Sequence, residues 1–189
     1  MHSVDLSKFF PVKKWNNYEE MIAYRNKILH IKNFKDDGFE KVCDVKEEYY
    51  YNRWCYTNIN KELMFDTHRS WVYAITLDDV IVKLGETGNP LGIKMSDGQP
   101  KLGSQCRLGR YRNGDGTDDY IRRELHDYLH DGHRISFWAK KCPIKMLSES
   151  IAGESIKVAN TIHKSLEAAY LQYFEDSISC LPMLNKSRK

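Results

Sequence analysis

Two short runs of β-branched and apolar residues, Trp71 to Leu77 and Val80 to Leu84, are separated only by Asp78 and Asp79. β-Branched side chains pack well on a pleated sheet, and a short polar pair between two such runs is typical of a tight turn. The pattern therefore predicts an antiparallel β-hairpin. This hairpin constrains the fold more than any other feature of the sequence, because the remaining elements must pack on it.

The segments after the hairpin predict further helices and a further strand. Residues 85–103 are rich in glycine and proline and predict a long loop, which is either functional or mobile. Residues 117–131 repeat apolar side chains at helical spacing, with Thr117 as the expected N-cap. Residues 135–140 alternate as a half-buried strand does, and residues 162–177 predict a last helix. This order predicts an α+β fold, a small antiparallel β-sheet flanked by helices, with an N-terminal extension.

The first third of the chain has a different character. Residues 1–68 are rich in aromatic and charged side chains without a clean period, although Tyr18 to Ile31 has the spacing of an amphipathic helix. No linker rich in proline, glycine and serine separates this part from the rest. We therefore interpret residues 1–68 as an extension that packs on a core formed by residues 69–189, rather than as an independent domain.

Composition excludes several classes of protein. The 189 residues have room for one domain with a full hydrophobic core, and the longest apolar stretches are too short to cross a bilayer. The N-terminus lacks the basic start, apolar run and cleavage site of a secretory signal. The five cysteines are odd in number and scattered, which favours reduced thiols over a disulfide framework or a zinc site. These features predict a cytoplasmic protein without a membrane segment.

Basic residues gather in one part of the chain although the formal net charge is only +3. The planar guanidinium group matches phosphate oxygens, so a local cluster of arginines indicates a nucleic-acid-binding surface. A solvated helix face balanced by nearby acidic residues explains the same charges, and both interpretations stay open at this point. The cluster consists of Lys94, Lys101, Arg107, Arg110, Arg112, Arg122 and Arg123.

Five short motifs follow one another in a recognisable order. Val72-Tyr73-Ala74-Ile75 lies on the first strand of the hairpin, and Lys83-Leu84-Gly85 lies on the second. Arg107 and Tyr111 form an Arg-x-x-x-Tyr motif, Glu167 lies on the last helix, and Pro182 with Asn185 forms a closing Pro-x-x-Asn. This order resembles that of the GIY-YIG nuclease family over roughly residues 70–186. Each motif alone is unspecific, and the resemblance rests on their order.

The resemblance implies a function and a set of site residues. It implies a metal-dependent endonuclease that hydrolyses phosphodiester bonds in double-stranded DNA, with Mg²⁺ held by Glu167 and Mn²⁺ as a substitute. Lys94, Lys101, Arg110 and Arg112 are expected to contact DNA. The implied catalytic residues are Tyr73, Lys83, Arg107, Tyr111, Glu167 and Asn185.

Two departures from the family pattern narrow the resemblance. Lys83 stands where the family usually has its second tyrosine, as in some GIY-YIG restriction enzymes and the related phage endonucleases. The loop between Gly85 and Arg107 is longer than the usual connection. The resemblance therefore favours a type II restriction endonuclease.

The chemistry of phosphodiester hydrolysis explains why such residues belong together. The reaction needs an activated water, positive charge at the phosphate and stabilisation of the negative charge on the leaving alkoxide. Arg107 would clamp the phosphate, and a single carboxylate at Glu167 suffices for Mg²⁺, which keeps waters and takes phosphate oxygens as ligands. A tyrosine becomes a better base beside a cation, so Lys83 would assist Tyr73. Tyr111 is the competing candidate for the base.

The length of the hairpin loop tests the pairing of Tyr73 with Lys83. A two-residue loop would place Tyr73 opposite Leu84 and direct Lys83 to the other face of the sheet. The two side chains share a face only if the loop has an odd number of residues, as in a three-residue turn with a bulge, and a clean two-residue hairpin would rule out the pairing. We therefore predict a hairpin loop with an odd number of residues.

Several alternatives remain. Within the nucleases, a phage or homing-type enzyme is the alternative to a restriction enzyme, and a non-catalytic DNA-binding protein with the same fold is the alternative outside them. Cutting both strands with one site per chain predicts a homodimer or a higher homo-oligomer. The N-terminal extension and the 85–103 loop are candidates for DNA-contacting or dimer surfaces.

Two other motifs are better explained without a ligand. His126 and His130 have a spacing that can hold zinc, but no glutamate adjoins them as in His-Glu-x-x-His, so solvated helix residues are the better interpretation. Residues 113–124 imitate a calcium loop but carry Asp118 where that loop needs glycine. We interpret Asp118 as a residue of a helix N-terminus.

Overall fold

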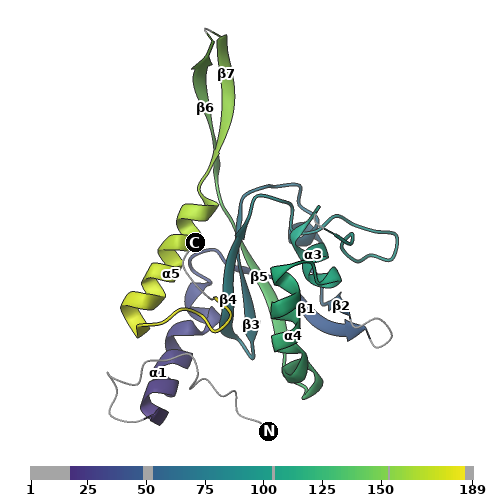
Figure 1. Ribbon diagram of the computed structural model, residues 1–189, viewed down its shortest axis with the longest axis vertical. Helices are drawn as coiled ribbons and strands as arrows, with labels where there is room; N and C mark the ends of the chain where they lie inside the picture. Colours follow the sequence, from purple (N-terminus) through teal and green to yellow (C-terminus); the bar gives the residue numbers. More distant parts are fainter. Residues whose placement is uncertain (1–17, 49–52, 104, 153, 186–189) are drawn as a thin grey trace.

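The computed structural model describes residues 18–48, 53–103, 105–152 and 154–185. It has the α+β architecture expected from the sequence, with a five-stranded antiparallel sheet flanked by helices (Figure 1). The strand order across the sheet is β2-β1-β5-β3-β4, so β4 is an edge strand. The strands of the sheet are β1 (Glu40–Glu48), β2 (Arg53–Thr57), β3 (Trp71–Leu77), β4 (Val80–Thr87) and β5 (Ile135–Lys141).

Helices cover both faces of this sheet. One face packs under α3 (Arg107–Asn113) and α4 (Thr117–His130), and the other packs under α1 (Tyr18–Leu29) and α5 (His163–Ile178) (Figure 1). Two short helices, η3 (Ile31–Phe34) and α2 (Lys61–Met64), complete the order. Strand β3 is buried along its whole length because it lies between β5 and β4 and under helices on both sides. Its seven apolar or β-branched residues fit that position.

The predicted helices and strands of the core are confirmed with small shifts at their ends. Helix α4 begins at Thr117 itself, so Gly116 rather than Thr117 is the N-cap residue, and it makes no side-chain cap. Strand β5 extends to Lys141, and α5 spans His163–Ile178. Strand β4 continues through Gly85 to Thr87, because this stretch pairs with β3, so the predicted loop begins later than expected.

The loop of the β3–β4 hairpin contradicts our prediction of an odd number of residues. Leu77 pairs with Val80 across a turn made only by Asp78 and Asp79, both with positive φ. The offset arises inside the strands instead, where the register shifts between Ile75 and Thr76 and leaves Val82 as an extra residue. Such a β-bulge moves all later pairs by one residue.

The bulge has a direct consequence for the predicted site. Beyond it, Ile75 pairs with Lys83 and Tyr73 pairs with Gly85. Directly paired residues of antiparallel strands lie on the same face, and side chains alternate along a strand. Tyr73 and Lys83 therefore share the face that is covered by α3 and α4. The β-bulge, and not an odd loop as we predicted, places them there.

The N-terminal region contributes directly to the sheet. Strand β1 pairs with β5 and β2 pairs with β1, so the sheet continues across the boundary that we placed at residue 68. Predicted helix 18–31 is present as α1, which lies beside α5. The extension thus supplies two of the five strands rather than only a covering layer.

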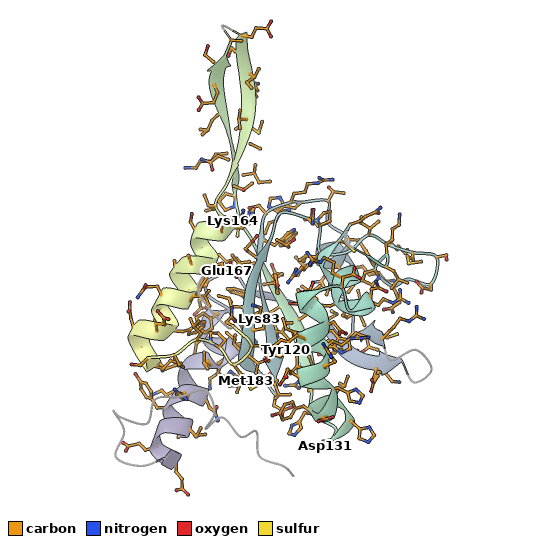
Figure 2. All side chains as sticks on the ribbon, viewed as in Figure 1. Lys83, Tyr120, Asp131, Lys164, Glu167 and Met183 are labelled. Carbon is orange, nitrogen blue, oxygen red and sulfur yellow. The ribbon has the colours of Figure 1, made fainter. Side chains whose placement is uncertain are left out.

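A second, two-stranded sheet projects away from the core (Figure 1). It is a hairpin of β6 (Ile144–Ile151) and β7 (Glu154–Thr161) between β5 and α5, and the sequence analysis did not predict it. Its side chains point outward along its length (Figure 2), and those of Met146 and Leu147 are exposed. No helix in the described parts of the chain has the length and apolar character that a membrane crossing requires.

Candidate active site

A cavity of about 390 Å³ opens at the edge strand β4. It is bounded by β3 and β4, by α3 and α4 on one side, by α5 on the other, and by the C-terminal segment after α5. Figure 2 shows Glu167 on α5, Lys83 on β4 and Tyr120 on α4 along this region, and all three line the cavity. Six of the residues that we predicted for the site contribute to its wall: Tyr73, Lys83, Arg107, Arg110, Glu167 and Asn185.

A glycine opposite Tyr73 creates the space for the tyrosine ring. A Cβ atom at Gly85 would lie 2.8 Å from Cε1 of Tyr73, with Cζ and the hydroxyl oxygen closer still. The ring can therefore lie across the backbone of β4 only because residue 85 has no side chain. In this way the hydroxyl of a residue that is 1% exposed reaches the wall of the cavity.

Arg107 connects the two candidate tyrosines. Its Nη2 atom donates to the hydroxyl of Tyr73, to that of Tyr111 over 3.1 Å, and to Oδ1 of Asp118 over 3.0 Å. The Tyr73 and Tyr111 hydroxyls lie 3.1 Å apart. Arg107 and Tyr111 meet because residues four apart on α3 share one helix face. Tyr111 does not line the cavity, but through these bonds the Arg-x-x-x-Tyr motif and Tyr73 form one hydrogen-bonded group.

Burial decides the protonation of both phenols. It raises the pKa of Tyr73 well above 10, and Tyr111 raises it further, while the guanidinium of Arg107 opposes the rise. Burial also raises the pKa of Tyr111 against the same guanidinium. Arg107 is a cation in direct contact with Tyr73, and the expected assistance from Lys83 stays a prediction. Both tyrosines are phenols at neutral pH in the unliganded protein.

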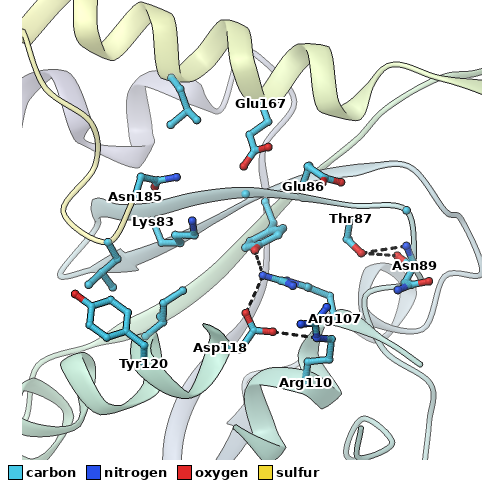
Figure 3. Close-up of a pocket in the computed structure, with 16 residues that line it drawn as sticks. Lys83, Glu86, Thr87, Asn89, Arg107, Arg110, Asp118, Tyr120, Glu167 and Asn185 are labelled. Atoms are coloured by element: carbon cyan, nitrogen blue, oxygen red, sulfur yellow. Dashed lines mark hydrogen bonds and ion pairs between the residues drawn. The ribbon is translucent and has the colours of Figure 1, made fainter. Parts of the chain in front are cut away.

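The carboxylates of two glutamates line the cavity. Glu167 extends from α5 toward Lys83 and Asn185, as Figure 3 shows. Glu86 lies on β4, and its Oε2 atom is 3.2 Å from Nε2 of His163. The other ring nitrogen of His163 is 3.1 Å from Oγ of Ser70. This chain of contacts fixes the side of the cavity next to Glu86.

Asn185 has a structural role at the edge of the sheet. Its side-chain amide donates to the carbonyl of Leu84 over 2.8 Å and accepts from the Leu84 amide over 2.9 Å. These two bonds imitate a neighbouring β-strand, and Leu184 adds a backbone bond to Val82. Asn185 thus fastens the C-terminal segment to β4, where it forms part of the cavity wall.

The four basic residues expected to contact DNA differ in position. Arg110 lines the cavity, whereas Lys94 and Lys101 are exposed on the loop between β4 and α3. Arg112 is buried, and its guanidinium donates to Asp97 and to the carbonyl of Pro100, each over 3.1 Å. The prediction of a DNA contact is therefore wrong for Arg112, which anchors that loop instead.

The same loop has many contacts with the core. Gln99 bonds to both backbone groups of Tyr56 on β2, and the amides of Arg107 and Leu108 donate to the carbonyls of Pro90 and Leu91. The loop therefore forms a defined platform beside α3 rather than a loose connection.

Sequence reasoning missed three polar residues of the site. Asp118 is buried between Arg107 and Arg110, and Glu86 and His163 form the pair described above. Asp118 was assigned to a helix N-terminus, which is where it lies, but that position did not reveal its partners. The arginines eight and eleven residues earlier were the one available signal for an ion pair.

Comparisons with known proteins give a fold but no family. No profile of a known protein family matches the sequence, and no curated protein matches it. A mutant of EndoII of bacteriophage T4 superimposes with a TM-score of 0.52 at 18% identity, covering 77% of this chain and 95% of that one. The chain shares the fold of EndoII. Restriction endonuclease HPY188I in complex with product DNA superimposes with a TM-score of 0.47 at 14% identity, covering 89% and 90% of the two chains.

The donor atoms of the cavity fit a hard cation such as Mg²⁺. Glu167 offers a carboxylate, and within the described residues no three histidine, cysteine or acidic side chains gather into a ligand cage. Mg²⁺ is commonly held by one or two carboxylates, with water and phosphate oxygens as its other ligands. A soft metal that needs thiolate or imidazole ligands does not fit this set.

Proposed function

We propose that this protein is a metal-dependent endonuclease that hydrolyses phosphodiester bonds of double-stranded DNA. The observation that carries the proposal is the convergence of Tyr73, Arg107 and Glu167 on one cavity from three separate parts of the chain. A phenol, a guanidinium and a carboxylate are the groups that phosphodiester hydrolysis needs around one phosphate. The motif order of the GIY-YIG family and the fold shared with EndoII support the same function.

The residues of the chain have distinct roles in this proposal. Arg107 and Arg110 bind the scissile phosphate and stabilise the charge that develops on its oxygens. Lys83 adds positive charge from the same face of the sheet. The phenolate form of Tyr73, whose hydroxyl proton has first passed to solvent, accepts the proton of the attacking water at its oxygen, and Tyr111 with Arg107 holds that oxygen in place.

Glu167 would hold Mg²⁺, and Mn²⁺ would serve in its place. When bound, the ion stabilises the leaving alkoxide and neutralises phosphate charge. Lys94 and Lys101 on the loop platform are suitably exposed to contact the DNA backbone outside the cavity.

We further propose a type II restriction endonuclease that acts as a homodimer or higher homo-oligomer. Among the described residues these groups come together in one cavity, and cutting both strands at one position needs two such sites. A phage or homing-type nuclease would use the same site. Sequencing of the cut ends separates these roles, because a restriction enzyme gives a unique palindromic site and a host-degrading nuclease gives scattered cuts.

Incubation with supercoiled plasmid tests the proposal. The purified protein should convert it to nicked and linear forms with Mg²⁺ or Mn²⁺, and should leave it intact with EDTA. Binding of the plasmid without any cleavage over a range of metal concentrations would instead indicate a non-catalytic DNA-binding protein.

A further inference from the structure

A buried carboxylate in the cavity wall pairs with the two arginines of the cavity. The side chain of Asp118 is only 1% exposed and lies in the first turn of α4. Its Oδ1 atom is 3.0 Å from Nη2 of Arg107, and its Oδ2 atom is 3.2 Å from Nε of Arg110 (Figure 3). Both arginines belong to α3, so one carboxylate on α4 forms ion pairs with two side chains of the neighbouring helix.

The position of Asp118 limits the directions that Arg107 can take. The same Nη2 atom that contacts Asp118 also donates to the hydroxyls of Tyr73 and Tyr111. An arginine side chain has many rotamers, and ordering it costs conformational entropy. A charged acceptor that contacts the same Nη2 atom as Tyr73 selects one of these rotamers before any substrate binds.

A buried ion pair is not the most stabilising contact that could join α3 and α4. Burial raises the pKa of the Asp118 carboxyl, and the two arginines oppose the rise. Taking such a charge out of water is costly, and apolar packing often stabilises a helix contact as well as a buried ion pair does. The buried carboxylate is therefore better explained by the orientation of the arginines than by stability alone.

We propose that Asp118 is a positioning residue, which orients Arg107 and Arg110 toward the scissile phosphate. The inference rests on the proposed nuclease function and adds to it a residue that the motif order does not contain. Asp118 also lines the cavity, but its side chain is only 1% exposed and its two oxygens contact the arginines. It acts through the two guanidinium groups, and its negative charge opposes DNA binding slightly while it keeps the arginines aligned for the reaction.

This role predicts opposite effects on binding and on turnover. The substitution Asp118→Asn keeps the size of the side chain but removes a negative charge next to the phosphate site. The KM for DNA should stay the same or fall, because the local charge becomes more positive. The kcat should fall by about 10- to 100-fold, because misaligned groups lose most of their catalytic effect.

A matched control lies one residue away. Asp119 also pairs with two arginines, Arg122 and Arg123, but it is more exposed and lies outside the cavity wall. Asp119→Asn therefore makes the same change in charge and in local ion pairing on the same helix turn. Its kcat and KM should stay within about twofold of the wild type, as for a surface substitution away from the site.

The experiment measures kcat and KM for cleavage of a supercoiled plasmid by the wild type, D118N, D118E and D119N, with a thermal melt of each. A lower kcat without a higher KM in folded D118N, with D119N unchanged, supports the role. Equal kcat values for D118N and the wild type would overturn it, as would a rise in KM with kcat unchanged.

If D118N does not fold, Asp118→Glu tests the positioning role instead. This variant keeps the charge but moves it by about one carbon–carbon bond, so it should fold and show a reduced kcat at an unchanged KM. A D118E variant with full wild-type kcat would overturn the positioning role. Absence of cleavage by the wild type would instead refute the proposed function itself, so the two failures are distinguishable.

Discussion

The ring of Tyr73 on β3 lies across the backbone of Gly85 on β4, its direct cross-strand partner. No other residue type fits at position 85, because even a Cβ atom there would collide with the ring. The pairing exists only because the bulge at Val82 shifts the register by one residue. A short irregularity in the edge strand therefore fixes the position of the candidate base.

Gly85→Ala should displace the Tyr73 ring. We expect a fall in cleavage rate of at least about 100-fold, since the hydroxyl leaves its contact with Arg107. Overpacking should lower the free energy of unfolding by about 1–3 kcal/mol. Plasmid cleavage and denaturant unfolding measure the two effects. Gly88→Ala is the control for packing, because a Cβ atom there lies 3.7 Å from its nearest neighbour, and it should leave the free energy of unfolding nearly unchanged.

Glu167→Gln should abolish metal-dependent cleavage while preserving the fold. The amide is of the same size but is a much weaker ligand for Mg²⁺ than a carboxylate. Cleavage rates and thermal melts of the variant give both results. Asp176→Asn removes an exposed carboxylate from the same helix and should remain active. Wild-type cleavage by the Gln variant would disprove the metal assignment.

Asn185→Ala should destabilise the protein. The substitution leaves the amide and carbonyl of Leu84 on the edge strand without their partner, which should cost about 1–3 kcal/mol in the free energy of unfolding. Urea denaturation measures the change. Asn160→Ala on the exposed β7 serves as the control, with an expected change below about 0.5 kcal/mol. Equal stability of both variants would refute the role of Asn185 in fastening the C-terminal segment to β4.

The cleavage rate should rise with pH through the neutral range. Because the pKa of Tyr73 is raised above 10, only a small fraction of phenolate is present at neutral pH. That fraction grows about tenfold for each pH unit until the pKa is reached, and the rate should follow it. Single-turnover rates between pH 6 and about 9.5 test this expectation.

Phenylalanine variants identify which phenol titrates. Tyr73→Phe should remove the dependence on pH together with most of the rate, whereas Tyr111→Phe should keep the slope at a lower rate, since Tyr111 only supports the Tyr73 hydroxyl. The opposite result would make Tyr111 the base. A rate plateau below pH 8 in the wild type would contradict a buried phenol as the base.

The parts of the fold that the sequence predicts are those with one regular pattern. The β3–β4 hairpin, α4, β5 and α5 each keep a period of two or of about 3.6 residues along one buried face. Strand β1 contains a shift in register between Lys41 and Cys43, which breaks the alternation that would have revealed it. The β6–β7 hairpin has no buried face, so its apolar residues follow no core pattern.

In the candidate site too, only the contacts that follow from a regular local pattern could be predicted from the sequence. Arg107 and Tyr111 lie four residues apart in the sequence, and helical geometry alone brings them together. Arg110 and Arg112 are two residues apart and point in nearly opposite directions on α3, which is why one lines the cavity and the other is buried under the loop. Predicting that difference requires knowing that residues 107–113 form a helix, which the sequence analysis did not predict. The contacts of Asp118 and Glu86 depend on tertiary packing, which no local pattern encodes.

The central claim is that Tyr73, Arg107 and Glu167 meet at one phosphate, and a crystal structure with uncleaved DNA and Mn²⁺ tests it most directly. The Tyr73→Phe variant would preserve the substrate, and anomalous scattering would locate the metal. We predict one phosphate within hydrogen-bonding distance of Arg107, about 3 Å, and a metal ion within about 2.5 Å of the Glu167 carboxylate. A DNA backbone that passes outside the cavity, with the metal bound elsewhere, would contradict the account.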